Sequence, residues 1–540
     1  MKRKYRYIDR ATRILAREEG TVSKDWGGRL PIALIYPNTY RLGMSSLAVH
    51  TLYRLFNDRP DVVCERAFWG YQSPPEDDEP PISLESQRPL TDFPLLTFSL
   101  SYEMDYFNTV QALRRAGIPL LADDRDESWP LILAGGPAVY ANPAPLADIL
   151  DVIFIGEAED FMPQLVDALQ EACRTSRPQA LRILAQVPGV YVPAIGNDPV
   201  SRVWKRDLDA QPATTQIYAP DTEFGDRALI EIGRGCVRGC RFCMAGYVYR
   251  PMRQVSLDAV LATARDALQY RDKLGLVSAA VSDHRQIDQI AVELRALGAR
   301  IAVSSMRVDP LSEPLLQALA DSGTRTLTIA PEAGSVRLRR CINKRQTDEQ
   351  LLHAVDLAAH HGFQQTKMYF MVGHPTETDA DIEDTVNLVL AARARFPGRL
   401  TINTTPYVPK PHTPFQWAAM TPVKILEARI KYLKRRLQPE RVTVRSDSPA
   451  WATVAGTLSR GDRQLGRVLA QMKGTSLREW RRALKAEGLS QEDYLRGRSM
   501  DEPLPWSVVD MGVSRRYLSR EMQTAIPGES DCSPQTQDCP

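Results

Sequence analysis

The stretch GRGCVRGCRFC, residues 233–243, decides how the rest of the chain is interpreted, because it holds three cysteines at C-x3-C-x2-C spacing. The chain of 540 residues has only eight cysteines, so three of them this close together indicate a site. Closely spaced thiolates bind soft metals, and iron–sulfur clusters take cysteine thiolates as ligands. We predict that Cys236, Cys240 and Cys243 hold a four-iron cluster with one iron left open, as catalytic metals keep a free position.

Zinc is the alternative for the same cysteines. A structural zinc site takes four Cys or His ligands, usually as two close pairs. The nearest histidine in the sequence is His284, and no second cysteine pair follows the triplet. The ligand count therefore favours the cluster. Glycines in the loop let the backbone curl tightly, and its arginines Arg234, Arg238 and Arg241 are predicted to offset the negative charge of cluster and thiolates.

The cysteine spacing, with the aromatic Phe242 before the last cysteine, resembles the radical S-adenosylmethionine (SAM) superfamily. The resemblance implies a 4Fe-4S cluster whose open iron is chelated by the amino and carboxylate groups of SAM. It also implies reductive cleavage of SAM to a 5′-deoxyadenosyl radical and an electron donor such as flavodoxin or ferredoxin.

Length and composition set wider limits. A chain of 540 residues is long enough for about three domains. A net charge of +2 with 25% charged residues does not call for a nucleic-acid or membrane partner. No apolar run reaches the roughly 18 residues of a membrane span, and the basic N-terminus lacks the apolar core of a signal peptide. The sparse cysteines suit a reducing cytoplasm, which we predict as the location.

Strand and helix patterns alternate over residues 29–175, after a helical arm at 1–28. This alternation predicts an α/β fold, a Rossmann-like domain with an open parallel sheet that binds ligands beyond the carboxyl ends of its strands. The predicted strands are 30–36, 62–64, 95–100, 131–134 and 151–156, with a loop at 37–45 and helices from about 45, at 106–116 and from 157.

Four segments of this region resemble the N-terminal cobalamin-binding domain of B12-type radical SAM proteins: YPNTYRLGMSSL (36–47), AGGPA (134–138), Asn142-Pro143 and GEAE (156–159). The resemblance implies that the nucleotide tail of a corrinoid lies in the sheet crevice. A structural domain without a ligand is the alternative, because the glycines do not spell G-x-G-x-x-G. The implied cobalamin contacts are Asn38, Thr39, Gly43, Ser45, Gly135, Gly136, Gly156 and Glu157.

We predict cobalamin binding without a histidine ligand to cobalt. Cobalamin proteins that ligate cobalt use Asp-x-His-x-x-Gly after the first strand, and that loop has no histidine here. His50, the one histidine before residue 284, lies within a predicted helix and is interpreted as a packing residue.

Residues 176–225 are rich in proline and are predicted to be a linker. Over 226–420, repeated strand–helix units predict a partial (β/α)6 barrel, whose chemistry belongs at the carboxyl ends of the strands. The predicted strands are 228–232, 276–282, 300–305, 326–330, 367–372 and 400–403, and the predicted helices are 256–272, 285–298, 311–322, 347–361 and 379–396.

Polar residues follow these strands and together suit a zwitterionic, ribose-bearing ligand, although each alone could cap a helix. The family pattern maps Ser305, Arg307 and Glu332 onto SAM contacts and places the 373–378 loop near the adenine. His374 and Cys341 stay open between a chemical and a packing role, and no catalytic residue is assigned beyond the cluster loop. The full predicted SAM set is Ser282, Asp283, Ser305, Arg307, Glu332 and Gly373.

Residues 421–526 are predicted to be helical, and 527–540 to be a disordered tail. The tail holds Cys532 and Cys539, too few for an auxiliary cluster. The basic helix at 423–437 could face RNA, but a solvated face is favoured.

The resemblance implies a radical SAM enzyme that is a cobalamin-dependent methyltransferase. Two alternatives remain: a radical enzyme that performs a non-methylating step such as cyclisation or rearrangement, and a non-enzymatic iron–sulfur or RNA-binding scaffold. Three ligands with an open iron favour catalysis over electron transfer, and the near-neutral charge argues against an RNA scaffold. The substrate is not predicted.

Overall fold

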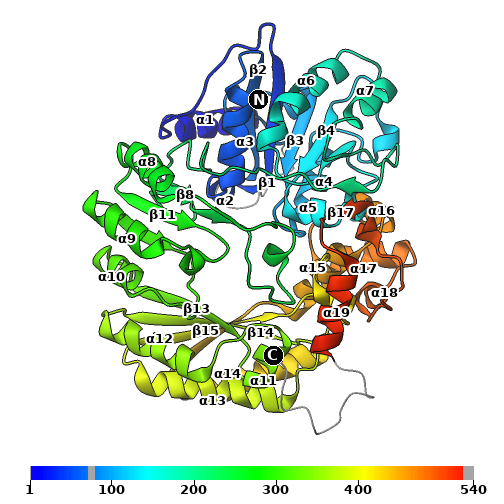
Figure 1. Cartoon of the computed structure of the whole chain (residues 1–540). Coiled ribbons are helices and arrows are strands. Elements are labelled where there is room, and N and C mark those ends of the chain that lie inside the picture. The colour runs from blue at the N-terminus through cyan, green and yellow to red at the C-terminus, as the bar shows by residue number, and fades with distance from the viewer. Residues whose placement is uncertain (1, 71–79, 527–540) are drawn as a thin grey trace.

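The computed structural model describes residues 2–70 and 80–526, so the predicted tail lies outside the described residues. Figure 1 shows an α/β unit at the top, a curved sheet with outer helices at the left and below, and C-terminal helices at the right. The cysteine loop crosses the middle of this arrangement. No described helix has the length and apolar character needed to cross a lipid bilayer.

The N-terminal sheet has six strands in the order β2-β1-β3-β4-β5-β6, parallel except for the last. Every residue of β2 and β3 is buried, as expected when helices cover both faces of a parallel sheet. The strands are β1 (Leu30–Thr39), β2 (Val62–Gly70), β3 (Leu95–Ser99), β4 (Leu131–Gly135), β5 (Val152–Phe154) and β6 (Val190–Tyr191). The helices near them are α1 (Lys2–Leu15), α3 (Leu47–Asn57), α4 (Asp105–Arg115), α5 (Pro137–Ala141), α6 (Met162–Ala172) and α7 (Arg177–Leu184).

Three local predictions differ from this structure. The loop expected at 37–45 is occupied by the end of β1 and by α2 (Tyr40–Gly43), because pairing with β2 continues to Thr39 across a register shift. The helix expected from Glu157 begins at Met162. The segment expected as a linker over 176–225 contains α7 and β6, which complete the N-terminal sheet and its cover.

The second half is a curved parallel sheet that does not close into a barrel over the described residues. A bridge between Met306 and Ile329 joins its three-stranded and four-stranded parts. Residues of β13 and β14 alternate between buried and half-buried, so one face meets the outer helices and the other faces inward. The strands are β8 (Ala228–Glu231), β11 (Lys273–Val277), β12 (Arg300–Val303), β13 (Thr326–Glu332), β14 (Gln365–Val372), β15 (Arg399–Pro406) and β16 (Val442–Ser446).

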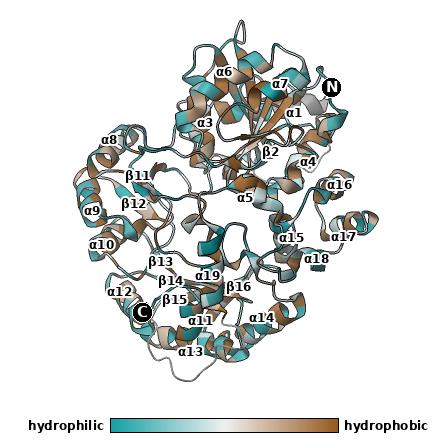
Figure 2. Ribbon diagram, turned by 45° about the vertical axis from the view of Figure 1, so that its right-hand side comes forward, coloured by the Kyte–Doolittle hydropathy of each residue, from teal (hydrophilic) through white to brown (hydrophobic). Residues whose placement is uncertain are grey.

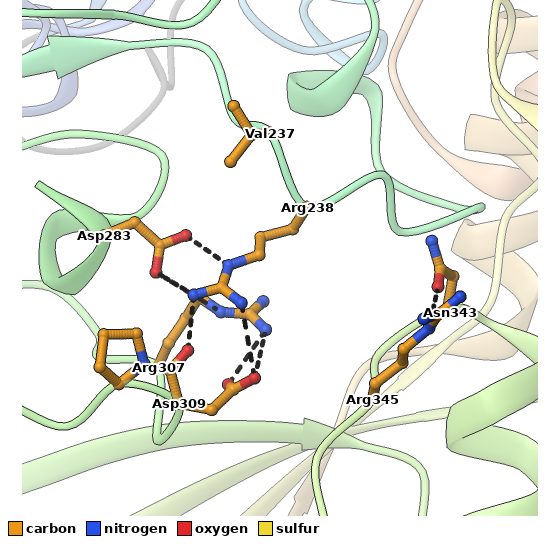
Figure 3. A pocket seen from close by; sticks show the side chains of 8 residues that line it. Val237, Arg238, Asp283, Arg307, Asp309, Asn343 and Arg345 are labelled. Atoms are coloured by element: carbon orange, nitrogen blue, oxygen red, sulfur yellow. Dashed lines mark hydrogen bonds and ion pairs between the residues drawn. The ribbon is translucent and has the colours of Figure 1, made fainter. Parts of the chain in front are cut away.

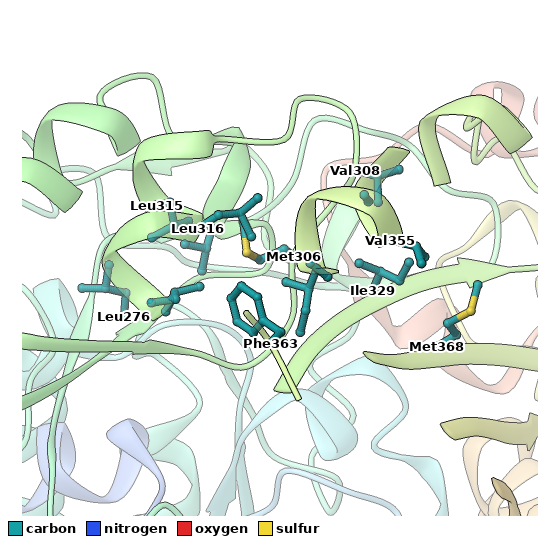
Figure 4. Packing of buried hydrophobic residues seen from close by; sticks show 14 of the residues in the cluster. Leu276, Met306, Val308, Leu315, Leu316, Ile329, Val355, Phe363 and Met368 are labelled. Atoms are coloured by element: carbon teal, nitrogen blue, oxygen red, sulfur yellow. The ribbon is translucent and has the colours of Figure 1, made fainter. Parts of the chain in front are cut away.

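All six strands predicted for this half are present. The second runs over Lys273–Val277 instead of the predicted 276–282, and β16 adds a seventh that the sequence analysis missed. Apolar residues of strands and outer helices form one core, in which Leu315 and Leu316 gather with Ile329 (Figure 4). The outer helices are α8 (Leu257–Leu268), α9 (Ile287–Ala296), α10 (Glu313–Asp321), α12 (Asp348–His360), α13 (Asp379–Arg395) and α14 (Val423–Leu437).

The basic helix α14 has the predicted bounds, and two of its arginines pair with carboxylates in or next to α13. Arg429 pairs with Glu377 at 2.7 Å, and Arg436 pairs with Glu383 at 2.8 Å. The polar face is therefore partly an intramolecular ion-pair surface. Lys424, Lys431 and Arg435 are exposed on it, and Figure 2 colours the helix partly hydrophilic and partly hydrophobic.

The C-terminal helices share one hydrophobic core with the N-terminal sheet. The ring of Trp480 meets that of Phe107 edge-on with centroids 5.6 Å apart. Asn142 donates from Nδ2 to the carbonyl oxygens of Ser459, at 3.0 Å, and Gly461, at 2.8 Å. The N-terminal sheet and the C-terminal helices are thus packed against each other. These helices are α15 (Pro449–Arg460), α16 (Gln464–Gln471), α17 (Leu477–Ala486) and α18 (Gln491–Leu495), whereas α19 (Arg515–Ala525) packs in two smaller apolar clusters.

Replacing Trp480 with alanine should destabilise the N-terminal sheet and the C-terminal helices together. The ring is fully buried in the shared core, so we expect Trp480→Ala to lower the free energy of unfolding by about 3–5 kcal/mol. Denaturant unfolding followed by hydrogen exchange would measure this. Arg481→Ala, exposed on the same helix, is the control. A variant whose N-terminal sheet keeps its wild-type protection would contradict the shared core.

Candidate functional site

The cysteine loop leaves β8 and is pinned at its base by a short antiparallel pair, β9 (Gly233–Arg234) with β10 (Arg253–Gln254). Gly235 has a φ of +86°, and a Cβ there would lie 2.5 Å from the carbonyl oxygen of Tyr249. Only glycine fits this turn. Farther on, the carbonyl of Gly239 accepts from the Tyr247 hydroxyl at 3.1 Å and from Nδ2 of Asn343 at 3.0 Å. The loop therefore has a fixed course around its thiols.

The three thiols lie in a largely desolvated place. Burial, with smaller contributions from the neighbouring Cys240 and Cys236, raises the pKa of Cys243 to about 11. Burial also raises the pKa of Cys240. The three thiols lie close enough to act on one another's charge. The loop therefore supplies three soft thiolates, a donor type that suits an iron–sulfur cluster.

Arg234 ties the cysteine loop to the N-terminal sheet. Its guanidinium contacts the carboxylates of Glu157 at 2.7 Å, Glu159 at 2.8 Å and Glu231 at 2.8 Å. Glu157 is 6% exposed and also pairs with Arg253 at 2.7 Å. The charge of Arg234 is therefore matched by carboxylates, contrary to its predicted role of offsetting the cluster.

The other two loop arginines form different tethers. Arg238 donates to Asp283 at 2.7 Å, and its charge also acts on Cys236. Arg241 pairs with Glu521 of α19 at 3.0 Å, so its charge is also balanced by a carboxylate. The loop is thus held by the N-terminal sheet, the curved sheet and the last helix at once.

The positive charges that favour the thiolate of Cys240 come from Lys344 and Arg307. Lys344 is 6% exposed and pairs with Glu332 at 2.9 Å. Glu332 has a φ of +68°, an unusual backbone conformation of the kind that gathers at functional sites. The sequence analysis missed Lys344, because a buried lysine within the basic run 337–345 has no local signal that separates it from its solvated neighbours.

A cavity of about 540 Å³ opens beside the loop and contains part of the predicted SAM set (Figure 3). Figure 3 shows Arg238 and Arg307 side by side between two carboxylates. Arg307 pairs with Asp309 at 3.1 Å, and its backbone N–H donates to Oγ of Ser282, also at 3.1 Å. The lining residues are Val237, Arg238, Asp283, Arg307, Asp309, Pro310, Asn343 and Arg345.

The structure does not bring every predicted SAM residue into this cavity. Ser282, Asp283 and Arg307 lie together, and Glu332 adjoins the thiols through Lys344. Ser305 is exposed. Gly373 lies against α14, where a Cβ would be 2.6 Å from the Leu426 side chain, so its lack of a side chain serves packing.

Of the two residues left open, His374 is buried near the third cysteine. Its ring centroid lies 5.8 Å from that of Phe242 and 5.2 Å from that of Tyr407. Burial lowers the pKa of His374 to about 3, so the ring is neutral at physiological pH. Cys341 packs between α11 (Val336–Cys341) and α19, with its sulfur 3.4 Å from the carbonyl oxygen of Ala525. A packing role suits this cysteine.

A second cavity, of about 330 Å³, lies at the carboxyl edge of the N-terminal sheet. Gly136 (φ +109°) and Gly156 (φ +123°) are required there, because a Cβ would meet backbone oxygens at 2.4 and 2.0 Å. Oγ1 of Thr97 is buried in the lining without a hydrogen-bond partner in the described structure. The lining runs from α3 and the strand ends to the cysteine loop, and includes Ala48, Thr97, Gly135, Gly136, Gly156, Glu157, Arg234, Gly235 and Tyr249.

Half of the predicted cobalamin contacts lie outside this cavity and serve the local fold. Thr39 is the last residue of β1 and also caps α2, so no open loop remains at this position. Asn38 donates to Asp105 at 2.8 Å, and a Cβ at Gly43 would collide with the ring of Phe68. Ser45 accepts a hydrogen bond from the backbone N–H of Glu223 at 2.8 Å.

His50 is a packing residue, as predicted. Its Nε2 lies 3.1 Å from the carbonyl oxygen of Met44, and its Nδ1 accepts from the backbone N–H of Gln216 at 3.3 Å. Burial lowers its pKa to about 4. Both ring nitrogens are used inside the fold, so neither is free for a metal.

Two family models match the chain, one described as "Radical SAM proteins, N-terminal" over residues 48–193 and one as "Radical SAM superfamily" over 230–389. The chain is 33% identical over 458 residues to "Uncharacterized protein MJ0966" of Methanocaldococcus jannaschii, covering 83% of this chain and 92% of that protein. It is 26% identical over 264 residues to a "tRNA-2-methylthio-N(6)-dimethylallyladenosine synthase" of Cereibacter sphaeroides, covering 47% and 58%.

Among solved structures, the cobalamin-dependent SAM radical enzyme OxsB, with aqua-cobalamin and SAM bound, aligns with a TM-score of 0.48 and 14% identity, covering 67% of this chain and 52% of that one. The chain thus spans little more than half the length of OxsB and of the Cereibacter synthase. The two family models and the alignment along nearly all of MJ0966 show that this chain belongs to the radical SAM superfamily of enzymes.

Proposed function

We propose that this radical SAM enzyme is a cobalamin-dependent methyltransferase. The observation that carries the proposal is the cavity at the carboxyl edge of the N-terminal sheet, because its lining ends on the cysteine loop itself at Arg234 and Gly235. A group bound there would lie between the sheet and the site of radical formation. When bound, the cluster supplies an electron to the sulfonium of SAM, and cobalamin supplies a transferable methyl group.

The residues at the loop fit a 4Fe-4S cluster. Cys236, Cys240 and Cys243 supply three thiolates, and Lys344 and Arg307 offset their charge. Burial keeps the thiol of Cys243 protonated at neutral pH, so metal binding must release that proton. The ion pairs of Arg234, Arg238 and Arg241 keep the loop in place, so the three cysteines that would hold a cluster keep one arrangement.

The residues beside the loop fit SAM. We assign Arg307 to the SAM carboxylate, because a guanidinium binds carboxylates in a bidentate manner. Asp283 and Glu332 are acceptors for the ammonium group and the ribose hydroxyls, and Ser282 positions Arg307 through its backbone N–H. Ser305 and Gly373 remain proposed contacts at the edges of this site.

The residues of the N-terminal cavity fit the nucleotide tail of a corrinoid. The walls are mainly apolar, with side chains from α3, α6 and the sheet. The strand end at Gly135 and the turns at Gly136 and Gly156 line the cavity with backbone, and the unpartnered hydroxyl of Thr97 offers a hydrogen bond. Glu157 stands at the inner edge and fixes the cavity relative to Arg234. With His50 engaged elsewhere, we propose binding without a histidine ligand to cobalt.

Removing one thiolate should abolish cluster binding. We expect Cys240→Ala, purified without oxygen, to fall from about four irons per chain to near none and to release no 5′-deoxyadenosine from SAM and dithionite. The control is Cys173→Ala, a half-buried cysteine at the C-terminal end of α6. Full iron content and SAM cleavage in the Cys240 variant would overturn the proposal at its base.

Arg307→Ala should weaken SAM binding with little effect on iron. Losing a charge-assisted contact costs about 1.5–3 kcal/mol, so the KM for SAM should rise at least about tenfold. The measurement is 5′-deoxyadenosine release against SAM concentration. Arg285→Ala, on the exposed side of the same region, is the control. An unchanged KM would remove Arg307 from the SAM site.

Filling the N-terminal cavity should block corrinoid binding alone. Ala48 is exposed at the cavity wall, so Ala48→Trp adds bulk without disturbing the core. We expect its affinity for hydroxocobalamin, measured by absorption titration, to fall at least about tenfold because the ring occupies the binding volume. Iron content should stay unchanged, and Ala48→Ser is the control.

The reaction products then test methyl transfer. The wild-type enzyme should form S-adenosylhomocysteine as well as 5′-deoxyadenosine, whereas the non-methylating alternative yields only the latter. Wild-type protein that binds no corrinoid, or an Ala48→Trp variant that binds it normally, would contradict the assignment of this cavity.

A further inference from the structure

We propose that the inner face of the curved sheet binds the substrate, and that this substrate is a small organic anion carrying a carboxylate or a phosphate group. The inner polar face consists of Lys367 and Tyr369 on β14, Asn403 on β15 and Arg445 on β16. The inference rests on the proposed function, because it assumes that a radical formed beside the cysteine loop acts on a bound substrate. Its test measures anion binding without SAM cleavage, so the two proposals can fail separately.

Strand pairing places these four side chains on one side of the sheet. Tyr369 is directly opposite Asn403, and Asn403 is directly opposite Arg445, so the three form a row across three parallel strands. Lys367 comes two residues before Tyr369, and successive side chains of a strand point to opposite faces. The intervening Met368 belongs to the core that the strands share with the outer helices. The row and Lys367 therefore share the face that is turned away from those helices.

The inner polar face differs from the usual inside of a β/α barrel, which branched apolar side chains fill. Lys367, Tyr369 and Asn403 are half-buried, and Arg445 is exposed. Oδ1 of Asn403 is itself buried and has no hydrogen-bond partner among the described residues. A buried acceptor without a donor costs free energy, so a ligand with a hydroxyl or amino group would be stabilised beside it.

Both cations of the inner polar face lack a carboxylate partner within the described part of the chain. Nζ of Lys367 lies 4.9 Å from the centre of the Tyr369 ring. Arg429 and Arg436 of the outer helix α14 differ, because each pairs with a carboxylate. From the spacing of strands and residues in a sheet, the Cα atoms of Lys367 and Arg445 are about 12 Å apart. Two such long side chains span this distance when they bind one anion.

The inner polar face leads to the cysteine loop. Met371, the next residue of β14 on the same side as Tyr369, packs in one apolar cluster with Phe242 of that loop. Two residues of a strand span about 7 Å. A ligand bound on Tyr369 would therefore extend to the level of Phe242, beside the cysteines that would hold the cluster.

The N-terminal half borders the same end of the sheet. Asp447, which follows β16, accepts a hydrogen bond from Oγ1 of Thr405 at 2.8 Å. Its charge also acts on Tyr102, whose pKa is raised to about 12 by burial first and then by the charges of Glu103 and Asp447. Tyr102 follows β3, the strand whose last residue, Ser99, lines the proposed corrinoid cavity. A substrate on the inner polar face would thus lie between the sheet that carries it and the proposed source of the methyl group.

A small organic anion fits this face better than RNA or a lipid does. Guanidinium and ammonium groups bind carboxylates and phosphates through charge-assisted hydrogen bonds, and the ring of Tyr369 offers a flat apolar contact. RNA binding depends on many phosphate contacts, whereas this face has two cations beside the carboxylate of Asp447. An acyl chain would bury the polar groups of Asn403 and Arg445 without hydrogen bonds, which is costly.

The first experiment measures whether the inner polar face binds an anion. The full-length protein, prepared without oxygen, is acetylated with N-hydroxysuccinimidyl acetate at constant ionic strength, and the rate at Lys367 is followed by mass spectrometry. We expect pyrophosphate or citrate to slow this rate at least about threefold, because a bound anion covers the amine. The exposed Lys424 on α14 is the control and should react at an unchanged rate. The anion that protects better distinguishes a phosphate site from a carboxylate site.

The second experiment tests the second cation of the face. Arg445→Met should remove the protection of Lys367, because the anion loses one of its two charged partners. Arg435→Met, exposed on α14, is the matched control and should keep the protection.

Equal acetylation rates of wild-type Lys367 with and without both anions would overturn the inference, and so would full protection in Arg445→Met. Protection of Lys367 by total tRNA and by neither small anion would overturn it as well. A wild-type protein that holds no cluster or leaves SAM uncleaved would instead refute the proposed function, while the acetylation rates still decide whether the face binds an anion.

Discussion

The carboxylate of Glu157, buried between Arg234 and Arg253, is the interaction on which the arrangement of the two halves depends. Burial disfavours its charge, but hydrogen bonds and attraction from the two guanidinium groups more than offset this and lower its pKa below the usual range. A buried ion pair of this kind is costly to break on one side only, because the remaining charge stays uncompensated. The end of β5 and the base of the cysteine loop are consequently fixed to each other.

This constraint explains why the two cavities adjoin. Glu157 lines the N-terminal cavity, while Arg234 begins the loop whose far side borders the cavity proposed for SAM. A second connection between the halves is the pair of Lys410 and Glu103, which joins the segment after β15 to the segment after β3. The C-terminal helices complete the arrangement by covering the free face of the N-terminal sheet. Radical chemistry needs such closure, because an exposed reactive intermediate would be lost to side reactions.

Predictions from local sequence patterns were correct where the feature depends only on residues that are close together in the sequence. The cysteine spacing, the six strands of the curved sheet and the bounds of α14 follow from periodicity and from residue chemistry within short windows. The same reasoning placed Ser282, Asp283 and Arg307 at one edge, since parallel strands end on the same side. It failed for Asn38 and Thr39, because strand pairing across space extended β1 through the expected loop.

The sequence by itself determined the spacing of the three cysteines, the glycine turns and the α/β character of both halves, because these depend on spacing and on backbone preferences. Only the tertiary structure decided which charges face the thiols. Lys344 reaches Cys240 by folding back from the end of α11, while two loop arginines find carboxylates far away in the sequence. Tertiary packing likewise decided that the C-terminal helices cover the N-terminal sheet. An apolar face does not by itself specify which distant segment will cover it.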